Sequence, residues 1–245
     1  MLAKLYKYYE VVAINSQQLV LPVSLPDTET FTSFYTGDNL LLLNYLKEIL
    51  NKSGFYSLYT WSAFLSGKTH LLHASCYYLS HLDKRISYIP LEQHFLLEPD
   101  ILLGLDDYDL VCLDNIDKIA GNKAWEVAIF DLFNRLLENN NSKLLITSNA
   151  SPKQVPFILP DLISRLEWGQ VYQLKELSDE DKLYALQLRA LLRGFELPTD
   201  VGLFLLKRVD RDMKTLSNLL DKLDKITITE QRKLTIPFIK TVFNL

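Results

Sequence analysis

The feature that most constrains the fold is a regular alternation of strand-like and helix-like segments between residues 38 and 177. Five short runs rich in apolar, β-branched or aromatic residues predict strands. The expected strands are 55–61, 86–91, 109–114, 143–147 and 171–174. Strands that are apolar throughout and separated by helices form parallel sheets with helices on both faces. The sequence therefore predicts an α/β fold for this part of the chain.

Helices are expected between these strands, where apolar residues recur at three- and four-residue spacing. Asp38 or Asn39 can cap the first helix, which continues to Leu50. The second begins near Gly67 and continues to about His81. The third is expected at 124–138, and its apolar face consists of Trp125, Ile129, Leu132, Phe133 and Leu136.

The strand pattern stops after residue 177, and the rest of the chain predicts helices only. Ser178 with Asp181 is typical of a helix start, and Gly194 is typical of a helix end. Further helices are expected at 199–209, 211–225 and 235–244. The expected division is a tail at 1–27, an α/β domain at 28–177 and a small helical domain at 178–245.

Composition narrows the class of protein. The 245 residues carry a formal net charge of −4, which argues against a broad basic surface that holds DNA. No run approaches the roughly 18 apolar residues that cross a bilayer, and the N-terminus lacks the pattern of a secretory signal. We therefore expect a cytoplasmic protein without a membrane contact. Cys76 and Cys112 lie in apolar runs, so we expect reduced core thiols.

A phosphate-binding turn follows the first expected strand. The segment from Ser62 to Thr69 approaches the pattern Gly, four residues, Gly-Lys-Ser/Thr, with Ser62 in place of the first glycine. Gly67 and Lys68 complete the pattern together with Thr69, whose hydroxyl can bind magnesium. An ordinary strand–turn–helix is the alternative. A lysine at the positive end of a helix dipole favours an anion there, which supports phosphate binding.

Two further polar residues follow buried strands. Asp114 ends the third expected strand and would hold the magnesium ion through water, although it could simply cap the next turn. Asn115 beside it is neutral and cannot accept a proton, so we expect slow or absent intrinsic hydrolysis. Asn149 follows the fourth strand and could reach the terminal phosphate, or cap a helix before Pro152.

These residues resemble the AAA+ domain of the DnaA family, and more closely the Hda family of regulators, which promote hydrolysis of DnaA-bound ATP. The resemblance runs from about residue 18 to the end. The matching positions are 25–27, 31–39, 70–74, 111–116, 160–162, 164–166, 168–170, 177–182, 189, 193–198 and 232–237. It implies an AAA+ module, a parallel sheet covered on both faces, followed by a small all-helical lid domain.

The resemblance also implies a nucleotide site and an arginine finger. It assigns nucleotide contacts to Gly67, Lys68, Thr69, His70, Asp114, Asn149 and Lys214. The bound species would be ADP with Mg²⁺ on Thr69 and Asp114. Lys214 stands where the family usually has an arginine, and it lacks the bidentate fork. Arg165 corresponds to the arginine finger; the alternative is a surface pair with Asp161.

A tail motif resembles the family's sliding-clamp-binding sequence. It consists of Gln18, Leu19, Leu21, Pro22 and Val23, with apolar side chains for a groove and a proline that keeps the strand extended. An unstructured arm is the alternative. Because the sequence stops after the last expected helix, we expect no counterpart of DnaA's DNA-binding domain, so DNA would be reached only through the clamp.

The functional expectation is a negative regulator of replication initiation. Bound to the DNA-loaded sliding clamp, it would supply Arg165 to the ATP form of DnaA and stimulate its hydrolysis without independent turnover. A homodimer is compatible with this expectation. The alternatives are a DnaA-binding adaptor without hydrolysis stimulation and a self-contained remodelling ATPase.

Overall fold

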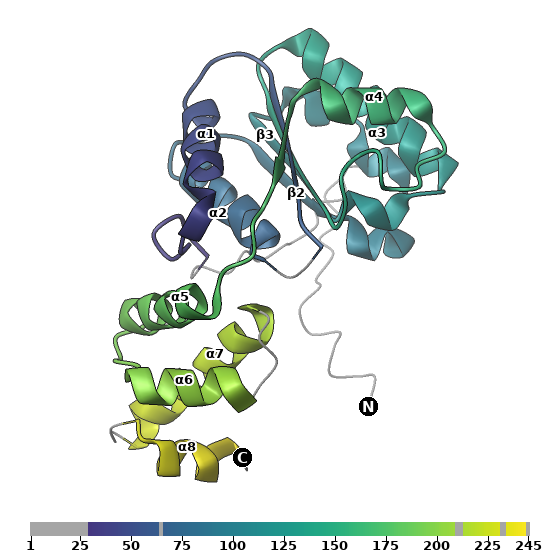
Figure 1. Ribbon diagram of the computed structural model, residues 1–245. Coiled ribbons are helices and arrows are strands. Elements are labelled where there is room, and N and C mark those ends of the chain that lie inside the picture. The colour runs from purple at the N-terminus through teal and green to yellow at the C-terminus, as the bar shows by residue number, and fades with distance from the viewer. Residues whose placement is uncertain (1–28, 64–65, 209–212, 231–233, 244–245) are drawn as a thin grey trace.

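The computed structural model describes residues 29–63, 66–208, 213–230 and 234–243, with the side chains of 213–214 and 225–230 left out (Figure 1). Its five-stranded sheet has the order β2-β3-β4-β1-β5, and all neighbours are parallel. The strands are β1 Tyr56–Trp61, β2 Ile86–Pro90, β3 Leu110–Asp114, β4 Lys143–Ser148 and β5 Gln170–Gln173. All five strands expected from the sequence are confirmed within one residue at each end.

Helices cover both faces of the sheet. They are α1 Leu40–Leu50, α2 Lys68–Ser80, α3 Lys123–Asn139 and α4 Pro160–Trp168. Successive strand residues point to opposite faces. In β3, Leu110 and Cys112 join the apolar cluster of α1 and α2, whereas Val111 and Leu113 join the cluster that contains α3 and α4. The expected α/β architecture is therefore confirmed.

A helical domain, here called the lid, follows the sheet and lies below it in Figure 1. Its helices are α5 Asp179–Leu192, α6 Thr199–Arg208, α7 Met213–Glu230 and α8 Ile236–Phe243. They have an apolar cluster of their own that includes Leu186, Val201 and Leu220. The side chain of Ser178 accepts a hydrogen bond from the Asp181 N–H, so the predicted start of α5 is confirmed.

Residues 29–39, here called the strap, precede α1 and connect the two domains. The predicted cap at Asp38 or Asn39 is wrong, because no side chain caps the start of α1. The Asn39 amide instead exchanges two hydrogen bonds with the backbone of Lys175, of 2.8 and 3.0 Å, beyond the end of β5. Because the side-chain oxygen and nitrogen of Asn39 are used in this tertiary contact, they do not cap α1.

Helix α4 was not expected as a separate element. The fully buried Glu126 of α3 accepts hydrogen bonds from the N–H groups of Gly121, Ile158 and Leu159, of 2.7, 2.9 and 2.7 Å. Pro160 then occupies the first helical position, where its missing N–H costs nothing. Glu126 therefore fixes where α4 begins.

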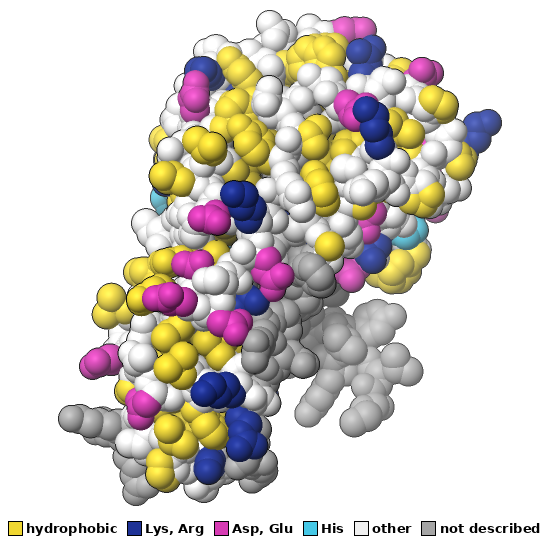
Figure 2. All heavy atoms as spheres, viewed as in Figure 1, with side chains coloured by type: hydrophobic (Ala, Val, Ile, Leu, Met, Phe, Trp, Pro, Cys, Tyr) yellow, Lys and Arg dark blue, Asp and Glu magenta, His cyan; other side chains and the backbone are white. Residues whose placement is uncertain are grey.

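The remaining expectations from composition can be compared with the described residues. Cys76 and Cys112 are buried free thiols, as predicted, and their Sγ atoms are 3.6 Å apart. None of the described helices combines the length and hydropathy needed to cross a bilayer. Figure 2 shows acidic and basic side chains on the described part of the lid, with most of the acidic ones nearer the sheet and most of the basic ones at the far end.

Candidate nucleotide-binding site

The phosphate loop, residues 62–69, joins the end of β1 to the start of α2. Gly67 has φ +98°, a left-handed conformation that favours glycine. A Cβ atom at Gly67 would lie 3.1 Å from Phe34 of the strap. The strap thus packs directly on the turn that exposes the first N–H groups of α2, which are suited to an anion.

Lys68 is held inside this turn. Its Nζ donates to the Ser62 carbonyl at 2.9 Å, to the Ser62 hydroxyl at 2.9 Å and to Asn149 Oδ1 at 3.3 Å. Burial lowers the pKa of Lys68, while the nearby carboxylates of Asp117 and Asp114 oppose that change. The ammonium therefore lies between the phosphate loop and the end of β4, next to Asn149.

Asp114, at the end of β3, is buried and accepts three hydroxyl hydrogen bonds. Thr69 Oγ1 and the Tyr88 hydroxyl each donate to Oδ2 at 2.8 Å, and Thr147 Oγ1 donates to Oδ1. A carboxylate offers about four acceptor positions, so a position on Oδ1 is left for a metal-bound water. The pairing of Thr69 with Asp114 fits a magnesium ion held directly by the hydroxyl and through water by the carboxylate.

The residue after Asp114 has an unusual backbone. Asn115 has φ +60°, and its N–H donates to Thr147 Oγ1 at 2.8 Å. Asparagine tolerates this left-handed conformation better than most residues. A neutral amide in a left-handed conformation therefore directly follows Asp114.

Asn149 is oriented by a carboxylate that the sequence analysis missed. Its N–H and its Nδ2 donate to Asp117 at 3.0 and 2.9 Å. Since Nδ2 is directed at Asp117, Oδ1 is left to accept from Lys68. No helix begins after Asn149 before Pro160 among the described residues, so its alternative role as a helix cap is wrong.

His70 faces away from the phosphate loop, toward the strap and the lid. Its Nε2 lies 2.8 Å from the Thr30 carbonyl and 3.2 Å from Ser33 Oγ, and its Nδ1 lies 2.6 Å from Nη2 of Arg189. Burial and the Arg189 cation lower the pKa of His70 to about 4. Among the predicted nucleotide-binding residues whose side chains the structure describes, His70 thus links the two domains.

Arg165 lies on α4, which covers the face of the sheet opposite to the face covered by α2. It belongs to the last turn of α4, and Trp168 at the end of this turn packs on Phe55, with ring centroids 5.6 Å apart. Phe55 precedes β1, whereas Lys68 contacts Ser62 just after β1, and a strand of six residues spans about 20 Å. Figure 1 shows α4 at the top of the sheet and the lid below it.

The guanidinium of Arg165 is half-buried on the surface. Its Cζ lies 5.9 Å from the centre of the Phe130 ring in α3. The described residues show no ion pair between Arg165 and Asp161, so the alternative of a surface pair is not observed. Arg165 therefore remains available to a second molecule.

Some predicted residues lie outside this description. The clamp-motif residues 18–23 and the loop residue Leu65 fall outside the described residues. Lys214 belongs to the first turn of α7, and its side chain is outside the description as well. The structure brings together Lys68, Thr69, Asp114 and Asn149, with Gly67 at the turn.

Two family models match this chain. The model "Hda, lid domain" matches residues 179–243, and the bacterial DnaA ATPase domain matches residues 100–173. The chain is an Hda-like, DnaA-related AAA+ protein. Both matches agree with the observed order of domains, an α/β AAA+ module followed by a helical lid.

Solved structures share the fold of this Hda-like protein. Domain III of the Thermotoga maritima replication initiation protein DnaA has a TM-score of 0.74 at 22% identity, covering 90% of this chain and 97% of that one. A DNA replication initiation factor has a TM-score of 0.68 at 21% identity, and the match covers 83% of this chain. AMPPCP-bound DnaA from Aquifex aeolicus has a TM-score of 0.67 at 19% identity, and the match covers 84% of this chain. The Hda-like chain spans 66% of the length of each of the last two.

Sequence reasoning missed several partners in the site of this Hda-like protein. Tyr88 and Thr147 donate to Asp114, and Asp117 orients Asn149. Thr147 and Asp117 lie at or just beyond the carboxyl ends of neighbouring strands, which is the signal that could have indicated them. Tyr88 lies in the edge strand β2 and gives no comparable signal.

Proposed function

We propose that this protein regulates the initiation of DNA replication by stimulating the hydrolysis of ATP bound to DnaA. Arg165 acts as the arginine finger, supplied to the nucleotide of the partner. The observation that carries the proposal is the location of Arg165, on the face of the sheet opposite to the helix that begins with the protein's own Lys68, and half-buried against Phe130. A guanidinium on that face is turned away from the protein's own phosphate loop, which supports a role at another molecule's phosphates.

The chemistry of arginine suits this role. A planar, permanently charged guanidinium binds phosphate oxygens in bidentate fashion and offsets charge that develops during hydrolysis. The Phe130 ring lies 5.9 Å from the guanidinium carbon and supports the cation. An arginine supplied in trans accelerates hydrolysis by about 10³–10⁵-fold, equivalent to roughly 4–7 kcal/mol of transition-state stabilisation.

The protein's own site binds a nucleotide, and we propose ADP with Mg²⁺. Lys68 and the first N–H groups of α2 hold the phosphates, while Thr69 and Asp114 hold the metal ion. The solved DnaA from Aquifex aeolicus is AMPPCP-bound, which supports a nucleotide at this place. The neutral Asn115 beside Asp114 supports slow hydrolysis, so the bound diphosphate persists.

The partners are ATP-bound DnaA and the sliding clamp in the cytoplasm. Gln18, Leu19, Leu21, Pro22 and Val23 form the proposed clamp-binding motif. Binding to a clamp on DNA raises the effective concentration of the protein near DnaA, so a weak contact through α4 becomes sufficient. DNA is approached through the clamp, in keeping with the net charge of −4.

The test is a reconstitution with DnaA-bound ATP and clamp loaded on DNA. Arg165→Ala is expected to lower stimulated hydrolysis by at least 10³-fold, while thermal unfolding and ADP binding remain unchanged. Arg208→Ala, an exposed arginine on lid helix α6, is the matched control and should stimulate like the wild type. If Arg165→Ala still stimulates hydrolysis, a DnaA-binding adaptor becomes the better description.

One observation favours a self-contained ATPase as the second candidate. The carboxylate of Asp117 lies beside Asn149 at the end of β4, and so an acid is present despite Asn115. Rapid ATP turnover by the isolated protein, lost in Asp117→Asn, would support this candidate over the arginine finger.

A further inference from the structure

The connection between β2 and β3, residues 91–109, exposes large apolar side chains to solvent. It contains the short helices η3 Leu91–Leu96, η4 Pro99–Leu102 and η5 Leu105–Asp107. Leu91, Leu102 and Leu105 are buried in the core cluster that contains α3. Phe95, Leu96 and Leu103 face outward and are 73%, 70% and 65% exposed. Since the buried leucines already anchor the β2–β3 connection, the three exposed side chains mark a contact surface.

The β2–β3 connection is also strongly acidic. It has no lysine or arginine, and its carboxylates are Glu92, Glu98, Asp100, Asp106, Asp107 and Asp109. Asp106 pairs with Arg135, and Asp109 pairs with Lys84. The other four carboxylates are exposed, and the described residues show no ion pair for any of them. A partner for this surface must therefore combine apolar side chains with positive charge.

The charge of the β2–β3 connection argues against several occupants. Nucleic acids and anionic lipid surfaces are negatively charged, so the unpaired carboxylates repel them. A two-fold dimer would place the same surface of a second copy against it, and the carboxylates of both copies would then meet. Like charges that face one another across an interface oppose binding. A positively charged polypeptide segment is therefore the favoured class of partner.

The chain carries such a segment at residues 1–9. This stretch contains Lys4 and Lys7 and no acidic residue. Its apolar side chains include those of Leu2, Leu5 and three tyrosines. A tyrosine suits the margin of an apolar contact, because its ring can be buried while its hydroxyl stays in water. Residues 1–9 lie outside the described residues, and their composition complements the β2–β3 connection in both polarity and charge.

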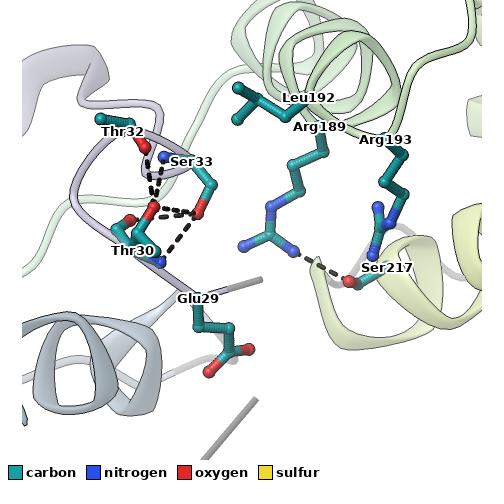
Figure 3. A pocket seen from close by; sticks show the side chains of 8 residues that line it. All are labelled: Glu29, Thr30, Thr32, Ser33, Arg189, Leu192, Arg193 and Ser217. Atoms are coloured by element: carbon teal, nitrogen blue, oxygen red, sulfur yellow. Dashed lines mark hydrogen bonds between the residues drawn. The ribbon is translucent and has the colours of Figure 1, made fainter. Parts of the chain in front are cut away.

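The first described residue lies close to β2. It is Glu29, and Figure 3, which shows the pocket beside the strap, has its side chain directed away from Thr30 and Ser33. The Glu29 carboxylate is hydrogen-bonded to Nδ1 of His73 at 2.5 Å, and the rings of His73 and Tyr88 have centroids 4.8 Å apart. Tyr88 belongs to β2, and the β2–β3 connection begins where this strand ends. The chain before Glu29 can extend by about 3.3 Å per residue, so its first residues can reach this surface.

We propose that residues 2–9 dock on the exposed side of the β2–β3 connection of the same molecule. Leu5 and the tyrosines cover the exposed apolar side chains, and the two lysines lie among the unpaired carboxylates. A contact within one chain acts at an effective concentration on the order of millimolar, so even a weak contact is populated. The docking requires neither DnaA nor a clamp, and so it goes beyond the proposed function.

Docking would also change how residues 18–23 are presented, a consequence that rests on the proposed clamp motif. A tail fixed at one end samples a larger volume than a loop that is fixed at both ends. Residues 10–28 would form such a loop, with one end at Glu29 and the other at the β2–β3 connection. The N-terminal segment would therefore set how far the clamp motif extends from the α/β domain.

Zero-length cross-linking with a carbodiimide tests the contact in the full-length protein. The reagent joins a lysine amine to a carboxylate as an amide and takes up the water that is lost, and it does so only where the two groups touch. Mass spectrometry should find peptides containing Lys4 or Lys7 linked to peptides from residues 92–100. In a mixture of ¹⁵N-labelled and unlabelled protein, each linked pair should carry one isotope only. Pairs of mixed isotope would assign the surface to a second copy and overturn the proposal.

Charge reversal supplies the matched comparison, measured as hydrogen–deuterium exchange in residues 91–103. Lys4→Glu with Lys7→Glu should raise exchange there at least about five-fold, because protection is lost when the segment is released. Adding Glu92→Lys and Glu98→Lys should restore the protection. The control is Lys207→Glu with Lys222→Glu, which changes two exposed lid lysines and should stay within about two-fold. Exchange that is unchanged in Lys4→Glu with Lys7→Glu would overturn the proposal and assign this surface to another partner.

The apolar half of the contact is tested with Phe95→Ser, an exposed position where folding should be retained and thermal unfolding checks that it is. This variant should lower the yield of the cross-links several-fold. Leu82→Ser, at a leucine that is 50% exposed after α2, is the control and should not lower it. A wild-type protein without these cross-links would also overturn the proposal. Arg165→Ala should leave both measurements unchanged, so a failure here is distinguishable from a failure of the proposed function.

Discussion

Arg189 of the lid donates a hydrogen bond through Nη2 to Nδ1 of His70, 2.6 Å away, and thereby joins α5 to the first turn of α2. Because a guanidinium only donates, Nδ1 of His70 must be the unprotonated nitrogen. Nε2 then carries the proton and donates to the Thr30 carbonyl at 2.8 Å. One neutral imidazole therefore connects the lid, the strap and the helix that begins with Lys68.

This contact predicts a loss of stability on acidification. The pKa of His70 is about 4 in the fold and about 6.5 in an unfolded chain, so the unfolded state binds the proton first as the pH falls. The stability is fully present above pH 6.5 and decreases toward pH 4. Glu29, His73 and Arg189 all face this imidazole. Urea unfolding at pH 7.5 and 5 should show a loss of about 2 kcal/mol.

His70→Asn is the matched control for this pH dependence. An asparagine keeps an acceptor near the position of Nδ1 but does not titrate. The variant should therefore unfold with a flatter pH dependence between 7.5 and 5. An equally steep dependence in His70→Asn would assign the effect to another group.

Gly67→Ala is expected to weaken nucleotide binding and to destabilise the fold. The left-handed φ of +98° costs an alanine about 1–2 kcal/mol, and the new Cβ would lie 3.1 Å from Phe34. Gly121→Ala is the control for backbone strain alone. Its φ is also left-handed, at +84°, but nothing lies within 4 Å of the added Cβ, so this variant adds no steric contact. Thermal unfolding with and without ADP should show a similar strain in both variants and impaired ADP binding in Gly67→Ala alone.

Asn115→Asp is expected to raise the intrinsic rate of ATP hydrolysis. Aspartate tolerates the left-handed conformation of this position and adds the proton acceptor that the amide lacks. General-base assistance is worth about 10²–10⁴-fold, so single-turnover rates should rise at least ten-fold. Asn115→Gly removes the strain of the left-handed backbone without adding a carboxylate, and so it should not accelerate hydrolysis. An unchanged rate in Asn115→Asp would mean that the neutral amide does not limit turnover.

Glu126→Ala is expected to destabilise the fold by about 3 kcal/mol or more, because it removes the buried carboxylate that accepts hydrogen bonds from the N–H groups of Gly121, Ile158 and Leu159, and hydrogen bonds to charged groups are worth about 1.5–3 kcal/mol each. Since Glu126 fixes the start of α4, stimulation of DnaA by Arg165 should fall as well. Glu138→Ala lies on the exposed side of the same helix and should stay within about 0.5 kcal/mol of the wild type. Urea unfolding and the reconstituted hydrolysis assay measure the two effects.

The sheet and the main site residues were predictable because their signals are local. Continuous apolar strands separated by amphipathic helices specify a parallel sheet, and its carboxyl edge is where Lys68 and Asp114 must meet. The partners of Asp114 were not predictable in this way. Tyr88 and Thr147 reach Asp114 only because β3 lies between β2 and β4. The order of the strands in the sheet cannot be predicted from the residues of any single segment.

The direction in which each side chain of a helix points was also not predictable from the sequence. Lys68, Thr69 and His70 are consecutive, but each residue of a helix is rotated by about 100° from the one before it. One of them therefore contacts the phosphate loop, the next contacts Asp114, and His70 is left to face the strap and lid. Asn39 failed as a predicted cap for a related reason, since its partner Lys175 is distant in sequence.

Arg165 on α4 and Lys68 at the start of α2 lie on opposite faces of the sheet, and this arrangement gives the molecule a polarity. An assembly in which Arg165 of one subunit meets a phosphate loop of another joins unlike surfaces, so it is head-to-tail and is not related by a two-fold axis. Such a contact leaves one pocket and one finger unused at its two ends. A single copy of this protein on the end of a row of related AAA+ subunits would therefore stop the row growing in that direction while leaving the opposite end open.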